Sequence, residues 1–265
     1  MKKQASTEFI YQIFALILSL ILVHTIYVAL IRPNANAILQ HQLEREAAGE
    51  VVVTERSIYI VLKDFEQESC FILMLWAIAI MGYKARQTVH ERRLLQQKLI
   101  QVDEGTRILP EDARQLTRPI QALPEQEQTY LLPRALTAAL NRFTATKSIQ
   151  DASAVTGEVC EKESDRLDSE LSMVRYIAWA IPSIGFIGTV RGIGEALSQA
   201  DKAVQGDIAG VTASLGVAFN STLIALVISI VVMFLVHQLQ LQQERLVLDI
   251  HGYIDNKLLR HLKAD

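Results

Sequence analysis

Polar side chains lie inside two stretches of sequence that are mostly apolar. Thr189 interrupts one of them, and the next contains Thr212, Ser214, Asn220, Ser221 and Thr222. Because a polar group without a partner is costly in lipid, these side chains are expected to face other helices or a wet cavity. Their oxygens could coordinate Na⁺ or pass on a proton. The alternative is that each hydroxyl only bonds the carbonyl group four residues earlier in its own helix.

The stretches that carry these residues are the predicted spans 173–197 and 209–236, which are joined by the short polar loop 198–208. Two spans with so short a loop form an antiparallel hairpin. Thr189 and Thr222 then fall at intermediate depth and can share one face. The cluster of three polar residues opposite Thr189 therefore favours the lining of an ion pathway over isolated bonds to the backbone.

Small residues and one proline shape the first span of this hairpin. Pro182 lacks a backbone donor and is expected to kink the helix. Gly185 follows it, and Gly188 and Gly192 form a small-x-x-x-small pair that lets two helices approach closely. We interpret this face as a packing surface that also suits a narrow pore wall.

One charged pair lies near the predicted periplasmic end of the same span. Arg191 and Glu195 are four residues apart, the spacing of an ion pair on one helix face. A solvated pair at the membrane rim and a part in gating are both compatible with this position.

Two earlier stretches are also predicted to cross the membrane. Residues 9–31 contain no Asp, Glu, Lys or Arg and would form a helix of roughly 35 Å, longer than the bilayer core of about 30 Å. The second predicted span, 67–83, has a short apolar part, Cys70–Tyr83. A buried or re-entrant helix is the alternative, but Lys84, Arg86 and further basic residues follow it and favour a span that ends in the cytoplasm.

The sequence therefore predicts an all-α membrane protein with four transmembrane helices and both termini in the cytoplasm. The predicted order is a cytoplasmic N-terminus (1–8), span 9–31, a periplasmic segment (32–66), span 67–83, a helical cytoplasmic domain (84–172), span 173–197, a periplasmic loop (198–208), span 209–236 and a cytoplasmic C-terminal helix (237–265).

Local signals divide the polar segments further. Residues 57–62 could form a short strand or a lead-in helix, and residues 90–101 are predicted to continue the second span as a helix. Four of the six prolines fall between 110 and 133 and predict short helices there. Ser148 and Asp151 have the spacing of a capping box, which predicts a helix that runs unbroken into span 173–197.

Composition excludes several classes of protein. The net charge of −3 argues against a bulk nucleic-acid binder. Cys70 and Cys160 are interpreted as unpaired thiols, and the six histidines show no metal-binding spacing. The stretch GTVRGIG has no preceding strand and lies in a predicted span, so a phosphate-binding loop is rejected. We expect no enzymatic activity, no cofactor and no metal.

Two motifs resemble a known family. IPSIGFIGTVRGIGEAL, residues 181–197, resembles the signature of the MotA/TolQ/ExbB proton channel family, in which a proline precedes G-[LF]-[LI]-G-T-V-x-G-[IM]. ASLGVAFNSTLIALVIS, residues 213–229, is similar to the family's second signature, a small-residue helix that carries a threonine. Some relatives have a glutamate about five residues before that threonine, whereas Val217 stands here, which puts a carboxylate relay at that site in doubt.

The resemblance implies a stator, the channel subunit of an ion-driven motor in the bacterial inner membrane. In the family, five copies surround a dimer of a single-span partner of the MotB, TolR or ExbD type, and this partner supplies a membrane aspartate. Thr189 and Thr222 would line the route of the transported H⁺ or Na⁺, with Asn220 and Ser221 beside them. The alternatives are a non-conducting membrane scaffold of the same fold or a secondary transporter.

Overall fold

The computed structural model describes residues 2–48, 57–97, 99–100 and 107–263. Every regular element in these ranges is a helix, and the only pairing of strand type is an isolated bridge between Ile108 and Leu262. The chain divides into two compact units, which are described separately. Unit 1 comprises Met1–Met81 and Met173–Val236, and unit 2 comprises Gly82–Ser172 and His237–Asp265.

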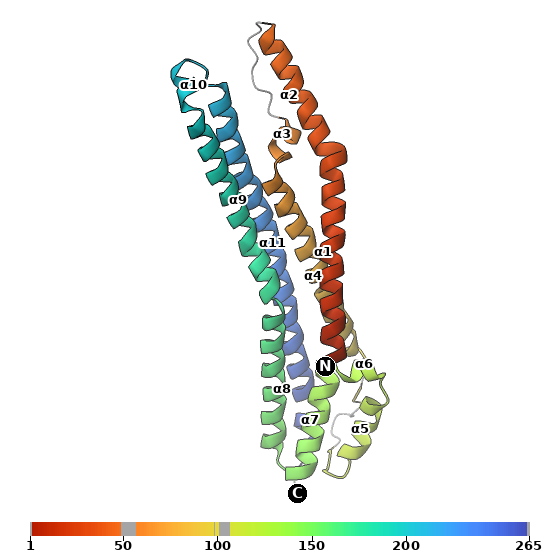
Figure 1. Cartoon of the computed structure of the whole chain (residues 1–265). Helices are drawn as coiled ribbons and strands as arrows, with labels where there is room; N and C mark the ends of the chain where they lie inside the picture. The colour runs from red at the N-terminus through yellow and green to blue at the C-terminus, as the bar shows by residue number, and fades with distance from the viewer. Residues whose placement is uncertain (1, 49–56, 98, 101–106, 264–265) are drawn as a thin grey trace. The chain divides into compact units, whose positions relative to one another are not determined.

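Unit 1 is built from long apolar helices (Figure 1). Its elements are α1 (Lys2–Ile26), the π-helical turn η1 (Tyr27–Ile31), α2 (Arg32–Ala47), α3 (Ile58–Leu62), the first part of α4 (Phe65–Leu94), α9 (Ser172–Ser198), α10 (Ala200–Val204) and the first part of α11 (Ala209–Lys257).

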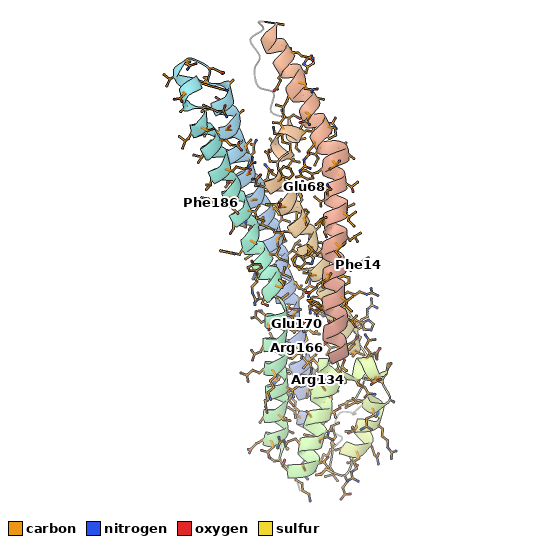
Figure 2. All side chains as sticks on the ribbon, viewed as in Figure 1. Phe14, Glu68, Arg134, Arg166, Glu170 and Phe186 are labelled. Atoms are coloured by element: carbon orange, nitrogen blue, oxygen red, sulfur yellow. The ribbon has the colours of Figure 1, made fainter. Side chains whose placement is uncertain are left out.

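Four helical stretches of the described residues are long and apolar enough to cross a membrane: Thr7–Gln42, Phe65–Leu94, Ile149–Ser198 and Ala209–His261. Large apolar side chains point outward from them, as Phe14 of α1 and Phe186 of α9 show in Figure 2, each 64% exposed. Such a surface is stable only in an apolar solvent. The predicted fold class, an all-α membrane protein, is confirmed.

The helix bounds settle two of the sequence-based alternatives and correct one prediction. Residues 58–62 form a helix and not a strand, and the Ser57 side chain caps it by accepting from the backbone N–H of Tyr59 at 3.3 Å. Residues 67–83 lie within one continuous helix, α4. The prediction that this helix extends through 90–101 is wrong, because α4 ends at Leu94 and a turn follows.

Helices α9 and α11 lie side by side and pack very closely. A Cβ atom added at Gly185 would come within 2.4 Å of Ala225, and one at Gly188 within 2.5 Å of Ser221. The glycines predicted to allow close packing are therefore the residues at the contact between the two helices.

Pro182 leaves the carbonyl group of Ala178 without its usual donor, because a proline has no N–H to return to the residue four positions earlier. The hydroxyl of Ser229 on α11 donates to this carbonyl oxygen at 3.1 Å. The helix remains continuous from Ser172 to Ser198, and a side chain of the neighbouring helix satisfies the freed backbone group.

Replacing Gly192 by alanine is expected to destabilise the protein by about 1–3 kcal/mol, the usual effect of overpacking. The new Cβ would lie 2.7 Å from both the backbone nitrogen of Ala218 and the carbonyl oxygen of Ser214, and backbone atoms cannot move aside cheaply. Thermal unfolding in detergent measures the effect. Gly194→Ala is the matched control, because no atom lies within 4 Å of its added Cβ. Equal unfolding midpoints for the two variants would contradict the close packing.

Unit 2 is a smaller helical bundle around the ends of α4 and α11. Its other elements are α5 (Ala113–Gln121), α6 (Glu125–Gln128), α7 (Leu131–Thr146), α8 (Ile149–Glu170) and the 3₁₀ turn η2 (Leu259–His261). Leu136, Phe143 and Ile250 are among the fully buried side chains of its core. Cys160 also lies here, and both it and Cys70 of unit 1 are buried free thiols.

The predicted cap of α8 is present, but the predicted continuity is not. The Ser148 hydroxyl accepts from the backbone N–H of Asp151 at 3.2 Å. The helix does not run unbroken toward Ser198, because a turn at Leu171 separates α8 from α9, and the N–H of Leu171 bonds the carbonyl of Asp168 at 3.1 Å.

Candidate ion pathway

Thr189 of α9 and Thr222 of α11 meet directly through their hydroxyl oxygens. Each hydroxyl also bonds a backbone carbonyl of the opposite helix: Thr189 donates to Ala218 at 3.1 Å, and Thr222 donates to Gly185 at 3.2 Å. Thr189 also lies 3.3 Å from the carbonyl oxygen of Gly185, four residues earlier in its own helix, which is the local bond that the alternative predicts. Purely local bonds nevertheless do not describe this pair, because its other contacts cross between the two helices.

The other two residues of the polar cluster differ from this pair. The Ser221 hydroxyl donates to the carbonyl of Val217 at 2.9 Å, which is the local bond that the alternative predicts. Asn220 is half-buried, and its side chain makes no hydrogen bond with the described part of the chain. The hairpin thus brings Thr189 and Thr222 together, whereas Asn220 stays apart from their contact.

The first turn of α4 reaches this hairpin, a contact that sequence reasoning missed. Gln67 is fully buried, and its Nε2 donates to the carbonyl of Val61 at 3.0 Å and lies 3.4 Å from the Ser221 hydroxyl oxygen. The side chain of Glu66 lies over Gly188, whose added Cβ would meet it at 3.1 Å. Helix α4 therefore places two polar side chains next to the hairpin, one at Ser221 and one at Gly188.

The predicted pair of Arg191 and Glu195 forms, with 3.1 Å between Nη1 and Oε1. Arg191 also makes two parallel bonds to Glu66, of 2.8 Å from Nε and 2.9 Å from Nη2. Fork-to-fork bonds of this kind are both strong and directional. They join α9 to the start of α4.

A second charged cluster on α4 also escaped sequence reasoning. Glu68 is buried, its Oε2 accepts from Arg32, and its Oε1 lies 2.7 Å from the imidazole Nδ1 of His24. The Arg32 guanidinium stacks 4.3 Å from the ring centroid of Phe65. The sequence did contain one signal for this cluster, because Glu68 is a charged residue near the start of an apolar helix. Charged groups in membranes are usually paired, so a partner could have been expected.

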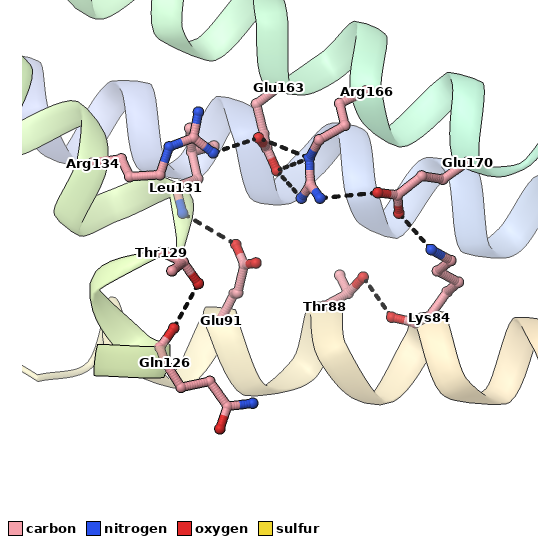
Figure 3. A network of polar contacts seen from close by, with 10 residues as sticks. All are labelled: Lys84, Thr88, Glu91, Gln126, Thr129, Leu131, Arg134, Glu163, Arg166 and Glu170. Atoms are coloured by element: carbon pink, nitrogen blue, oxygen red, sulfur yellow. Dashed lines mark hydrogen bonds and ion pairs between the residues drawn. The ribbon is translucent and has the colours of Figure 1, made fainter. Parts of the chain in front are cut away.

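Unit 2 contains a buried network of charges (Figure 3). Glu163 of α8 accepts from Arg134 at 3.0 Å and from Arg166 at 3.1 Å, and Arg166 also bonds Glu170 at 2.9 Å. Glu170 in turn accepts from Lys84 of α4 at 2.7 Å. The network ties α4, α7 and α8 together.

Glu91 faces this network from α4 but has a weaker partner (Figure 3). Its Oε2 accepts only a 3.4 Å contact from the backbone N–H of Leu131. Burial raises the pKa of Glu91 to about 7, and repulsion by Glu163 adds to the increase.

The fold and the site together define a class. The chain is a polytopic helical membrane protein in which paired hydroxyls lie between its last two apolar helices. Residues 127–251 match the sequence profile of the MotA/TolQ/ExbB proton channel family. This segment contains both threonines and makes up just under half of the chain, and the match agrees with the two motifs. Comparison with curated proteins and with solved structures gave no match.

Proposed function

We propose that the chain is the channel subunit of an ion-driven motor in the bacterial inner membrane, with both termini in the cytoplasm. Five copies would surround a dimer of a single-span protein of the MotB, TolR or ExbD type. The observation that carries the proposal is the contact of Thr189 with Thr222, since it places paired hydroxyls within a match to a proton channel family.

The proposed mechanism depends on the cost of a buried charge. A membrane aspartate on the partner would be neutralised by H⁺ or Na⁺ on entry and would become charged again on release. Because an unpaired charge in the membrane costs several kcal/mol, rotation of the ring would be allowed only in the neutral state. The membrane potential supplies about 2.3 kcal/mol per charge per 100 mV to drive each step.

Thr189→Val and Thr222→Val test the proposal, because valine keeps the shape of threonine and removes the hydroxyl. Each variant, co-purified with its single-span partner and reconstituted in liposomes, is expected to lose up to about tenfold in ion flux, the factor that corresponds to one hydrogen bond of about 1.4 kcal/mol. Native mass spectrometry is expected to find five copies of the chain with two of the partner.

Thr212→Val is the matched control, because the exposed Thr212 hydroxyl bonds only the carbonyl of Ile208 in the turn before it, at 3.0 Å. Unchanged flux in Thr189→Val and Thr222→Val, in a correctly assembled complex, would instead favour a non-conducting scaffold. A stable monomer that does not bind the single-span partner would contradict the proposal that the chain is a motor subunit.

A further inference from the structure

Two buried oxygen atoms at the start of α4 have no hydrogen-bond partner among the described residues. They are Oε1 of Gln67 and Oδ2 of Asp64. Gln67 is 0% exposed, and Asp64 precedes α4 by a single residue, so the two side chains are one helical turn apart. A buried polar atom that stays unpaired costs about 1–3 kcal/mol, which calls for an explanation at each of the two.

The groups that contact the Gln67 amide are acceptors. The Gln67 amide nitrogen donates to the carbonyl of Val61 and is directed to the Ser221 hydroxyl oxygen. The other atom of the amide, Oε1, is therefore the acceptor that has no donor among the described residues. The Ser221 proton is committed to the carbonyl of Val217. Oxygen acceptors without a donor are the ligands that a hard cation prefers.

The charges nearby favour the same kind of ligand. Arg191 holds Glu66 and Glu195 closely and reaches Asp64 only at 4.0 Å, through Oδ1. Three carboxylates thus surround one guanidinium. Lys63 and the hydroxyl of Tyr27 also interact electrostatically with Asp64. Burial raises the pKa of the Asp64 carboxyl, as expected for a carboxylate that lacks a full counter-charge.

We propose that Asp64, which directly precedes α4, and Gln67 of α4 bind a monovalent cation together with Ser221 of α11. This cation is either Na⁺ or a hydrated proton, bound as it enters the ion pathway. This inference rests on the proposed channel function, and it extends the pathway beyond the hairpin to α4. Ser221 connects the two parts, because it contacts Gln67 and is the chain neighbour of Thr222.

Binding is tested on the full chain in detergent by thermal unfolding. Sodium chloride replaces choline chloride at constant ionic strength and pH, and in a second series pH is varied without Na⁺. If the site takes Na⁺, the midpoint should rise by about 3 °C in sodium, because a ligand bound only to the folded state stabilises it. If it takes a hydrated proton, the rise should appear in the second series only, and this series is run on proteins that also carry Glu91→Gln so that the titration of Glu91 does not contribute.

Either response should be lost in both Asp64→Asn and Gln67→Met. Both substitutions keep the size of the side chain; the first removes the carboxylate charge, and the second removes the amide oxygen. Ser69→Ala is the matched control, because the exposed Ser69 hydroxyl bonds only the carbonyl of Phe65, at 2.8 Å. A midpoint in choline near that of the wild type shows that each variant folds. A wild-type response that survives in Gln67→Met, or no response of either kind in the wild type, would overturn the site.

Flux through the reconstituted complex tests the place of the site on the pathway. Gln67→Met is expected to reduce ion flux about tenfold, and Ser69→Ala is expected to leave it unchanged. If Thr189→Val loses flux while Gln67→Met conducts like the wild type, this inference fails and the channel function stands. If the wild type itself does not conduct, the channel function fails, and the unfolding series alone decides whether the site exists.

Discussion

Replacing Glu163 by alanine is expected to lower the thermal unfolding midpoint of the protein by about 5 °C. Glu163 is 2% exposed, and Arg134 and Arg166 both donate to its carboxylate. Removing it takes away the counter-charge of Arg134 and one of the two counter-charges of Arg166, which keeps its bond to Glu170. Because both arginine side chains are partly exposed, solvent screens the charges left behind, and the expected cost is about 1–2 kcal/mol, below that of a fully buried pair.

The matched control for this substitution is Glu158→Ala on the same helix. Glu158 forms an i,i+4 pair with Lys162, but both side chains are in solvent, so its removal is expected to leave the midpoint unchanged. A double variant, Glu163→Ala with Arg134→Ala, should lose less stability than the two single changes added together, because the second change removes a charge already unpaired. Additive losses would contradict the network.

Glu91→Gln is expected to make the protein less sensitive to pH between about 4.5 and 7. The ordinary pKa of this carboxyl is 4.5, and in the folded chain burial and then repulsion by Glu163 raise it to about 7. In that range the folded state holds a proton that the unfolded state has released. Stability contributed by this proton is therefore complete below pH 4.5 and is lost as pH rises through 7.

The pKa difference corresponds to about 3 kcal/mol, which the wild type should lose over this window and the glutamine variant should not. Unfolding midpoints of both proteins from pH 4.5 to 8 measure the difference, and the variant should be the more stable above pH 7. Glu158→Gln serves as the control with an exposed carboxyl. Parallel pH curves for Glu91→Gln and the wild type would refute the shifted titration.

The two predictions concern one region and constrain each other. Glu163 and Glu91 face each other from α8 and α4, and the negative charge of the first helps to keep the second protonated. Removing Glu163 should therefore bring the titration of Glu91 closer to its ordinary range. The Glu163→Ala variant should accordingly show a shallower pH dependence than the wild type.

Local features of the chain allowed the fold class and the hairpin to be predicted from sequence. Apolar length identifies helices that suit a bilayer, and the short loop 198–208 makes the last two antiparallel. This places Thr189 and Thr222 at similar depth without knowledge of the fold. The glycine spacing likewise indicated which face of α9 allows close packing.

Helix ends were predicted less well, for a physical reason. The end of α4 at Leu94 and the turn at Leu171 lack a strong local stop signal such as proline or glycine at the break itself. Helices in such segments end where packing with neighbours requires it. The residues that pack there come from distant parts of the chain.

The sequence by itself thus predicted a helical membrane protein with motifs similar to those of the MotA/TolQ/ExbB family, and it placed Thr189 and Thr222 at similar depth in the last hairpin. Only the tertiary structure showed that Gln67 meets Ser221, that Glu66 holds Arg191, and that Glu91 lies against Glu163. The first two pairs are separated by 154 and 125 residues. Apolar length and helix period act over a few turns, whereas partners for buried polar groups are chosen by the packing of whole helices.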